Sequence, residues 1–237
     1  MFAEPKSTRF VLSLTTRCLS PGLSLGLGFF LALGFFLALG FFLALGSVAS
    51  TASAAEWVLE KQADGIDVYT RPVARSDIKE FKGEGVIGVE IEAIVALLRD
   101  SSRFKDWFPN TSESKLLKRD GAVSYQYSVM RTPWPIADRD NVFLSVLTRD
   151  ESTGRIDISV DAAPDAHPIQ RGRHRVTRAK GSWRLTPQGP DETHVTFTMH
   201  LEPGGGIPDW MVNARVVATP FEVLVNLRSI LSTSENH

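Results

Sequence analysis

The amino-acid sequence predicts an α+β domain in which a long antiparallel sheet packs on two helices. Windows in which apolar and polar side chains alternate indicate strands, and two windows in which apolar residues recur every three or four positions indicate helices. All of these windows lie within residues 55–237. Residues 1–54 have a different composition and form a separate segment.

Residues 1–54 have the order of a secretory signal: a basic start, a long apolar stretch and a run of small residues. The apolar stretch is longer than an ordinary signal core because Gly-Phe-Phe-Leu-Ala-Leu occurs three times in tandem, at 28–33, 34–39 and 40–45. We expect a signal peptide cleaved after Ala54, at Ala52-Ser53-Ala54, and export to the periplasm. The alternative is an uncleaved inner-membrane anchor, which also places residues 55–237 outside the cytoplasm.

Alternation is strict in three windows, Gly121–Met130, Arg155–Asp161 and His194–Glu202. One dry face and one wet face are typical of antiparallel sheets. In the first window the apolar face carries Val123, Tyr125, Tyr127 and Val129. Less regular strands are expected at Gly65–Thr70, Glu80–Val89, Asn141–Arg149, Arg173–Arg178 and Gly181–Thr186.

Helical spacing predicts one helix over Ile91–Phe104 and a longer one over Pro208–Leu231. Pro208 and Asp209 suit a first helical turn, where proline loses no hydrogen bond and an acid favours the positive end of the dipole. A single sheet face offers more apolar surface than one such helix covers. A sheet that curls around the helix would therefore leave a cavity between them.

Composition and motifs exclude several classes of function. The chain has 26 Lys and Arg against 27 Asp and Glu, a near-neutral balance that argues against a nucleic-acid binder. Its single cysteine, Cys18, lies in the first segment, so residues 55–237 offer no disulfide and no thiolate nucleophile. The five histidines lack metal-ligand spacing, and neither a Gly-x-Ser-x-Gly elbow nor a phosphate loop occurs. We therefore predict no catalytic residue, no metal and no cofactor.

Two further features allow more than one interpretation. Arg171, Arg173 and Arg175 alternate, and they form either a solvated sheet face or a patch for anionic lipid head groups. Gly204-Gly205-Gly206 precedes the last helix and Pro220 lies inside it. We interpret the glycines as a hinge and the proline as a weak point of the helix.

Four motifs in series resemble the START family, the steroidogenic-acute-regulatory-related lipid-transfer domains. They are Arg103-Phe104-Lys105-Asp106-Trp107, Pro133-Trp134-Pro135-Ile136-Ala137-Asp138-Arg139-Asp140, Gly181-Ser182-Trp183-Arg184-Leu185-Thr186-Pro187 and Glu202-Pro203-Gly204-Gly205-Gly206-Ile207-Pro208-Asp209-Trp210. The resemblance covers residues 56–232, in order and with sensible spacing.

The resemblance implies the helix-grip fold, a curved antiparallel sheet wrapped around a long C-terminal helix with a hydrophobic tunnel between them. It implies that the chain binds one lipid or other hydrophobic molecule without covalent chemistry. Apart from the resemblance, the concentration of apolar residues in the first segment predicts a monomer, and the charge balance argues against nucleic acid as a partner. The alternating arginines allow a transient contact with a membrane surface. The tunnel-lining candidates are Tyr125, Tyr127, Phe197, Met199, Trp210, Ala214, Val217, Phe221 and Leu224, and the loop and rim candidates are Trp134, Arg139 and Asp140.

The ligand class stays open at this point. Sterol-carrying members of the family have an arginine on the strand after the Arg-Asp pair, where this chain has a position near Ser145. A phospholipid, fatty acid, quinone or hopanoid-type molecule therefore fits as well as a sterol. The same architecture includes aromatase/cyclases and dehydratases, which would need a proton-transferring group such as Tyr125, Tyr127, His200 or Asp157. A quinone-binding or partner-binding module is a third alternative.

Overall fold

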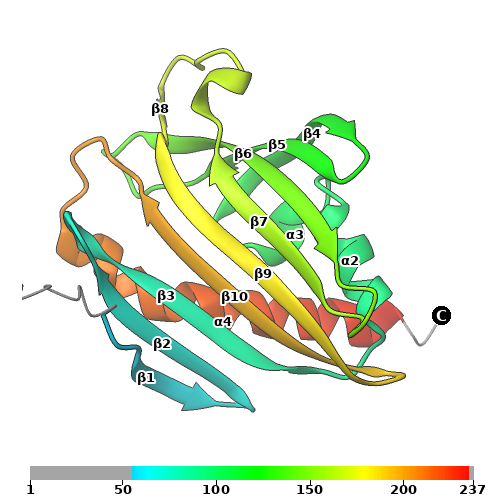
Figure 1. The fold of residues 1–237 in the computed structure, drawn as a ribbon. Coiled ribbons are helices and arrows are strands. Elements are labelled where there is room, and N and C mark those ends of the chain that lie inside the picture. Colours follow the sequence, from blue (N-terminus) through cyan, green and yellow to red (C-terminus); the bar gives the residue numbers. More distant parts are fainter. Residues whose placement is uncertain (1–54, 235–237) are drawn as a thin grey trace, which may run out of the picture. The chain divides into compact units, whose positions relative to one another are not determined.

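A computed structural model describes residues 55–234 of the chain, and Figure 1 shows their fold. The predicted signal peptide, its repeats and its cleavage site lie outside the described residues. Within residues 55–234, no helix combines the length and the apolar character that crossing a bilayer requires.

The described residues form an α+β fold of ten strands, three α-helices and one short 3-10 helix. The strands are β1 (Val58–Ala63), β2 (Ile66–Val73), β3 (Ser76–Ile87), β4 (Thr111–Asp120), β5 (Val123–Met130), β6 (Asp138–Arg149), β7 (Ile156–Ala162), β8 (Arg173–Arg175), β9 (Arg178–Gly189) and β10 (Glu192–Glu202). The helices are α2 (Ile91–Arg99), α3 (Phe104–Trp107), η1 (Pro164–Ala166) and α4 (Asp209–Ser234).

The strands form one curved sheet in the order β1-β2-β3-β10-β9-β7-β6-β5-β4, and every pairing along this path is antiparallel. The short strand β8 pairs with the start of β6 in parallel. Helix α4 runs along one face of this sheet, and α2 and α3 lie on the same side near β4 (Figure 1). The α+β helix-grip architecture predicted from the sequence is confirmed.

The main hydrophobic core lies between α4 and the sheet. It joins the inner faces of β3, β7, β9 and β10 to the C-terminal half of α4, where Val223, Leu224 and Leu227 are fully buried. Helix α4 is continuous through Pro220. The proline that was interpreted as a weak point of the helix therefore does not break it.

Two predicted element boundaries also differ from the structure. The expected helix over Ile91–Phe104 is two helices, because the carboxylate of Asp100 accepts hydrogen bonds from the backbone and the hydroxyl of Ser102, at 3.0 and 2.6 Å, and turns the chain. The expected strand Arg173–Arg178 is interrupted at Val176. Before the interruption β8 pairs with β6, and after it β9 pairs with β7. Strands β1 and β4 were not predicted.

Candidate functional site: a cavity under the curved sheet

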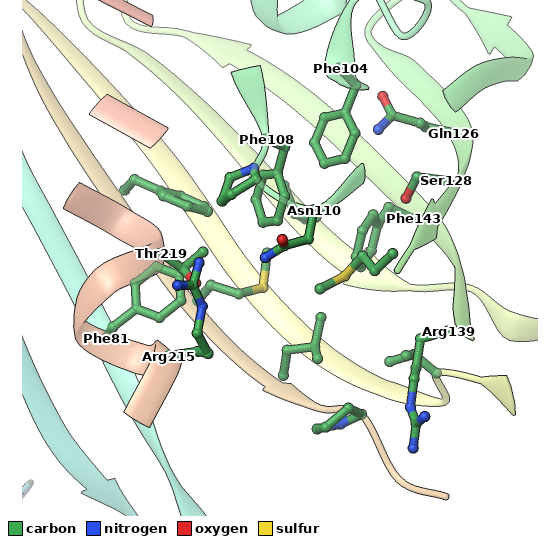
Figure 2. Close-up of a pocket in the computed structure, with 18 of the residues that line it drawn as sticks. Phe81, Phe104, Phe108, Asn110, Gln126, Ser128, Arg139, Phe143, Arg215 and Thr219 are labelled. Atoms are coloured by element: carbon green, nitrogen blue, oxygen red, sulfur yellow. The ribbon is translucent and has the colours of Figure 1, made fainter. Parts of the chain in front are cut away.

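A cavity of about 470 Å³ lies between the sheet and the three α-helices (Figure 2). Most of its lining residues are aliphatic or aromatic. The aromatic wall combines α3 and its C-terminal neighbour with strands β3, β6, β9 and β10, and consists of Phe81, Phe104, Trp107, Phe108, Phe143, Trp183 and Phe197. A cavity of this size and lining is typical of a small-molecule site.

The aromatic rings support one another as well as the cavity wall. Trp183 stacks on Phe197 with ring centroids 4.0 Å apart, and Trp107 meets Trp183 edge to face at 5.9 Å. Such ring pairs contribute about 0.5–1.5 kcal/mol beyond the burial of their area. The rings of the wall therefore pack against one another in the absence of a ligand.

Strand β5 presents its polar face to the cavity. Ser124, Gln126 and Ser128 line the cavity, and on the neighbouring strand Ser145 does the same. The tyrosines Tyr125 and Tyr127 alternate with these residues and lie on the opposite face. The strand was predicted correctly, but the face that was expected to meet the ligand is the outer one.

A second, smaller core explains this inversion. Tyr127 and Val129 pack with Val142 on the outer face of β5 and β6, and all three are at most 2% exposed. The segment that holds η1 and β8 covers them: the ring of His167 lies 4.8 Å from that of Tyr127. Because the apolar face of β5 is buried there, its polar face is left for the cavity.

The side chains of helix α4 that face the cavity also differ from the predicted ones. The lining residues from this helix are Met211, Val212, Arg215, Val216 and Thr219. Each step along a helix turns the side chain by about 100°, so the neighbouring positions face elsewhere. Trp210 and Ala214 are exposed, while Val217, Phe221 and Leu224 pack against the core.

Two of the nine predicted tunnel-lining residues, Phe197 and Met199, line the cavity. Whether they contact a ligand stays a prediction. The seven others lie outside the lining: Tyr125 and Tyr127 on the outer face of β5, and Trp210, Ala214, Val217, Phe221 and Leu224 on other faces of α4. The residues that replace them are the polar members of β5 and the stripe that begins at Met211.

Arg139, predicted at the rim, lines the cavity and holds the glycine segment before α4. It donates hydrogen bonds to the carbonyl oxygens of Gly204 and Gly205, at 2.7 and 3.1 Å, and to that of Ala137. Both glycines have positive φ, and a Cβ on Gly205 would lie 2.8 Å from Arg139 Nη2. The glycines therefore allow the guanidinium to approach the backbone.

Asp140 and Trp134 lie elsewhere than on the cavity wall. Asp140 is fully buried and accepts two hydrogen bonds from Arg175, at 3.1 and 2.8 Å from its Nε and Nη2. Arg173 forms an ion pair with Glu113 and also donates a hydrogen bond to the Tyr127 hydroxyl. Because Arg173 and Arg175 both have carboxylate partners, these two arginines form no free basic patch. Trp134 is 92% exposed in the loop between β5 and β6.

The cavity lining carries positive charge and no negative charge. It includes Lys79, Arg99, Arg131, Arg139 and Arg215, and none of its residues is Asp or Glu. Two of the five have carboxylate partners outside the lining, in Glu60 for Lys79 and Glu222 for Arg215. Burial lowers the pKa of the Arg139 guanidinium from its usual value, although an arginine stays charged at neutral pH.

Of the side chains that most often transfer protons or bind metals, His, Asp, Glu and Cys do not line the cavity, although Lys79 does. The lining residues include no His, Tyr or Cys. His200 lies near Ser76, and Asp157 binds Arg155 and Arg184 on the surface. Within residues 55–234, no three His, Cys, Asp or Glu side chains gather as a metal site would require.

Comparisons with known proteins agree with this geometry. Residues 48–236 match the START domain family. The chain is 37% identical to an uncharacterised protein of Pseudomonas aeruginosa over 77% of this chain and 90% of that one. It is 26% identical to the phosphatidylcholine transfer protein of Rattus norvegicus, over 68% of this chain and 77% of that one. The crystal structure of a STAR-related lipid transfer protein fragment from Xanthomonas axonopodis is similar with a TM-score of 0.70 and 41% identity, over 74% of this chain and 98% of that one.

Proposed function

This chain belongs to the START domain family, and from this premise we propose that it binds one hydrophobic molecule in the cavity and carries it non-covalently. The observation that carries the proposal is the cavity of about 470 Å³, walled mainly by aromatic and aliphatic side chains. The relatives named as lipid transfer proteins support the same activity.

Burial of apolar area supplies the affinity. A hydrophobic ligand gains about 25 cal/mol for each Å² of apolar surface removed from water. The aromatic wall is already formed, so little ordering of side chains opposes binding. The polar residues of β5 and β6 then fix the orientation of the ligand.

Carriage explains the lining better than catalysis does. A cyclase or dehydratase of this architecture needs a side chain that gives or takes a proton near neutral pH. The groups first considered for that role, Tyr125, Tyr127, His200 and Asp157, lie outside the lining. The residues that do line the cavity serve for packing, hydrogen bonding and charge.

Two exposed tryptophans support contact with a membrane surface during uptake and release. Trp134 is 92% exposed and Trp210 is 70% exposed. Their chain neighbours Pro133 and Met211 line the cavity. Arg139 donates hydrogen bonds to Ala137, in the loop of Trp134, and to Gly204, in the segment that precedes the helix of Trp210. Tryptophan favours the interface between water and lipid, so this end of the cavity suits docking on a bilayer.

The proposal includes export. Residues 1–54 are a signal peptide in this account, and residues 55–237 act as a monomer in the periplasm. An uncleaved leader would instead tether the same domain to the inner membrane.

A transfer assay tests the proposed function. The purified full chain should accelerate movement of pyrene-labelled phosphatidylcholine from donor to acceptor vesicles, with a rate proportional to protein concentration. Trp134→Ala should slow transfer without changing the amount of lipid bound, because it removes a membrane contact and no part of the cavity. A chain that neither binds nor moves any lipid would contradict the proposal.

A further inference from the structure

Four buried side-chain atoms on three residues of β5 and β6 have no hydrogen-bond partner among the described residues. They are Ser128 Oγ, Asn141 Oδ1, Asn141 Nδ2 and Arg139 Nε. The three residues are at most 2% exposed. A buried polar atom without a hydrogen-bond partner destabilises the fold, so a cluster of four such atoms requires a reason.

These residues share the cavity face of the sheet. Ser128 lies directly opposite Asn141 in the pairing of β5 with β6, so their side chains leave the sheet on the same side. Arg139 precedes Asn141 by two residues on the same strand and points to the same side. Ser128 and Arg139 line the cavity, whereas Asn141 is not part of the lining. Figure 2 shows Ser128 next to Phe143, with the Arg139 side chain farther along the cavity.

Arg139 lacks the carboxylate partner that the nearby Arg175 has. Arg175 is buried and bound by the carboxylate of Asp140. Arg139 is also buried, at 2% exposed against 8% for Arg175. It donates hydrogen bonds only to backbone carbonyl oxygens, and no Asp or Glu oxygen lies within 4.0 Å of it among the described residues. A buried cation is normally neutralised. The charge of Asp138 acts on Arg139 without a direct ion pair, so this end of the cavity has room for a directly bound anion.

We propose that Ser128, Asn141 and Arg139 form a subsite for the anionic head of an amphiphilic ligand, with carboxylate or phosphate oxygens. The subsite rests on the proposed function, since it lies in the same cavity. Its donors are the Arg139 Nε–H, the Asn141 amide and the Ser128 hydroxyl. The Arg139 Nε–H, the Asn141 Nδ2–H and the Ser128 O–H have no acceptor to give up when an anion binds. The fourth atom, Asn141 Oδ1, is an acceptor and takes no hydrogen bond from the anion.

The subsite fixes the direction of the ligand. The next residue on the same face of β6 after Asn141 is Phe143, which begins the aromatic wall. An anionic head held at Arg139 therefore places its apolar chain along Phe143 and toward Phe104. A neutral ligand of the same shape gains the wall but leaves the donors unpaired.

Binding of cis-parinaric acid and of its methyl ester to the delipidated full chain tests this subsite, because the two probes differ in the ionised carboxylate. Charge-assisted hydrogen bonds contribute about 1.5–3 kcal/mol, so the acid should bind roughly tenfold or more tightly than the ester. Asn141→Leu and Ser128→Ala should remove this preference, so that the acid and the ester bind with similar affinity. Ser124→Ala, on the same face of β5 but outside the cluster, should keep the preference.

Thermal melting of the ligand-free variants separates binding from structure. Asn141→Leu removes two unpartnered polar atoms at similar volume, so the melting temperature should stay unchanged or rise while acid binding weakens. A fall in melting temperature with an unchanged preference for the acid would overturn the subsite. Equal binding of acid and ester by the unaltered chain would also overturn it, although the proposed function would survive. Failure of both probes to bind would count against the proposed function itself.

Competition identifies the source of the anion. Oleate or phosphatidate should displace cis-parinaric acid. The stronger competitor of the two shows whether the subsite prefers a carboxylate or a phosphate head group. Oleyl alcohol and diacylglycerol should compete roughly tenfold or more weakly. Displacement by inorganic phosphate as strong as that by the lipids would show a site for a free ion and would overturn the proposal of an amphiphile.

Discussion

Gly83 of β3 and Pro220 of α4 meet so closely that a Cβ on Gly83 would lie 2.9 Å from Pro220 Cβ. The same Cβ would lie 3.3 Å from Leu224 Cδ1. Strand and helix are therefore in direct contact at the middle of α4. The N-terminal half of the helix covers the cavity, and the C-terminal half packs in the core, with this contact between them.

Gly83→Ala should destabilise the protein because the helix has to move away from the sheet. Overpacking of this kind costs about 1–3 kcal/mol, which urea denaturation measures. Gly88→Ala is the matched control, since a Cβ there meets nothing within 4 Å. Equal stability of the two variants would show that α4 does not rest on β3 at this point.

Val216→Trp should fill the cavity and prevent lipid binding with little loss of stability. Val216 is 7% exposed and lines the cavity, so the larger side chain enters existing space. Ala214→Trp is the control, because Ala214 is exposed on the same helix and should keep both binding and stability. A large loss of stability in Val216→Trp would indicate a solid core at this position instead of a cavity. Fluorescent-lipid binding and thermal melting on both variants decide between these outcomes.

Asp140→Asn should destabilise the fold strongly. It leaves Arg175 buried without its carboxylate, and removing one partner of a buried pair costs about 3–5 kcal/mol. Glu92→Gln breaks the exposed pair with Arg149 and should cost less than about 1 kcal/mol. Similar losses in the two variants would contradict the structural role of the buried pair.

The turn between β6 and β7 should show a depressed acid pKa. The hydroxyl and the backbone of Ser152 donate to Asp150, at 2.6 and 3.1 Å. These bonds, together with one from the Thr153 side chain, lower the pKa of Asp150 to about 2. Because the folded pKa lies below the unfolded value, this contribution to stability is complete above about pH 4 and is lost as the pH falls toward 2.

Ser152 provides the test of that shift. NMR titration of the Asp150 carboxyl carbon should show the pKa rising toward 3.8 in Ser152→Ala, while Ser152→Thr keeps the hydroxyl and the low value. An unchanged pKa in Ser152→Ala would show that these hydrogen bonds do not set it.

Periodicity predicted most strands correctly because alternation depends on local residues. It could not predict β1 and β4, the two ends of the sheet path. Edge strands carry many polar and charged residues, and in β4 the sequence Thr-Ser-Glu-Ser-Lys-Leu-Leu-Lys-Arg-Asp shows no regular alternation. Their assignment depends on a partner strand that the local sequence does not reveal.

The site was harder to predict than the fold. On β5, alternation identified two faces correctly, but which face meets the cavity depends on the η1 and β8 segment that buries Tyr127 from outside. On α4, a shift of one residue moves the stripe from Ala214 to Arg215. The sequence did contain one signal for the correct face of β5, the polar series Ser124, Gln126 and Ser128. A ligand with a polar head group needs polar side chains of this kind in the cavity wall.

The most direct test of the central claim is organic extraction of the purified full chain, followed by quantitative mass spectrometry. The account predicts one hydrophobic molecule bound per chain in the unaltered protein, and none in Val216→Trp. A folded chain that carries no such molecule and takes none up from vesicles would contradict it. Equal amounts of lipid on both proteins would contradict it too, because the lipid would then be bound outside the cavity.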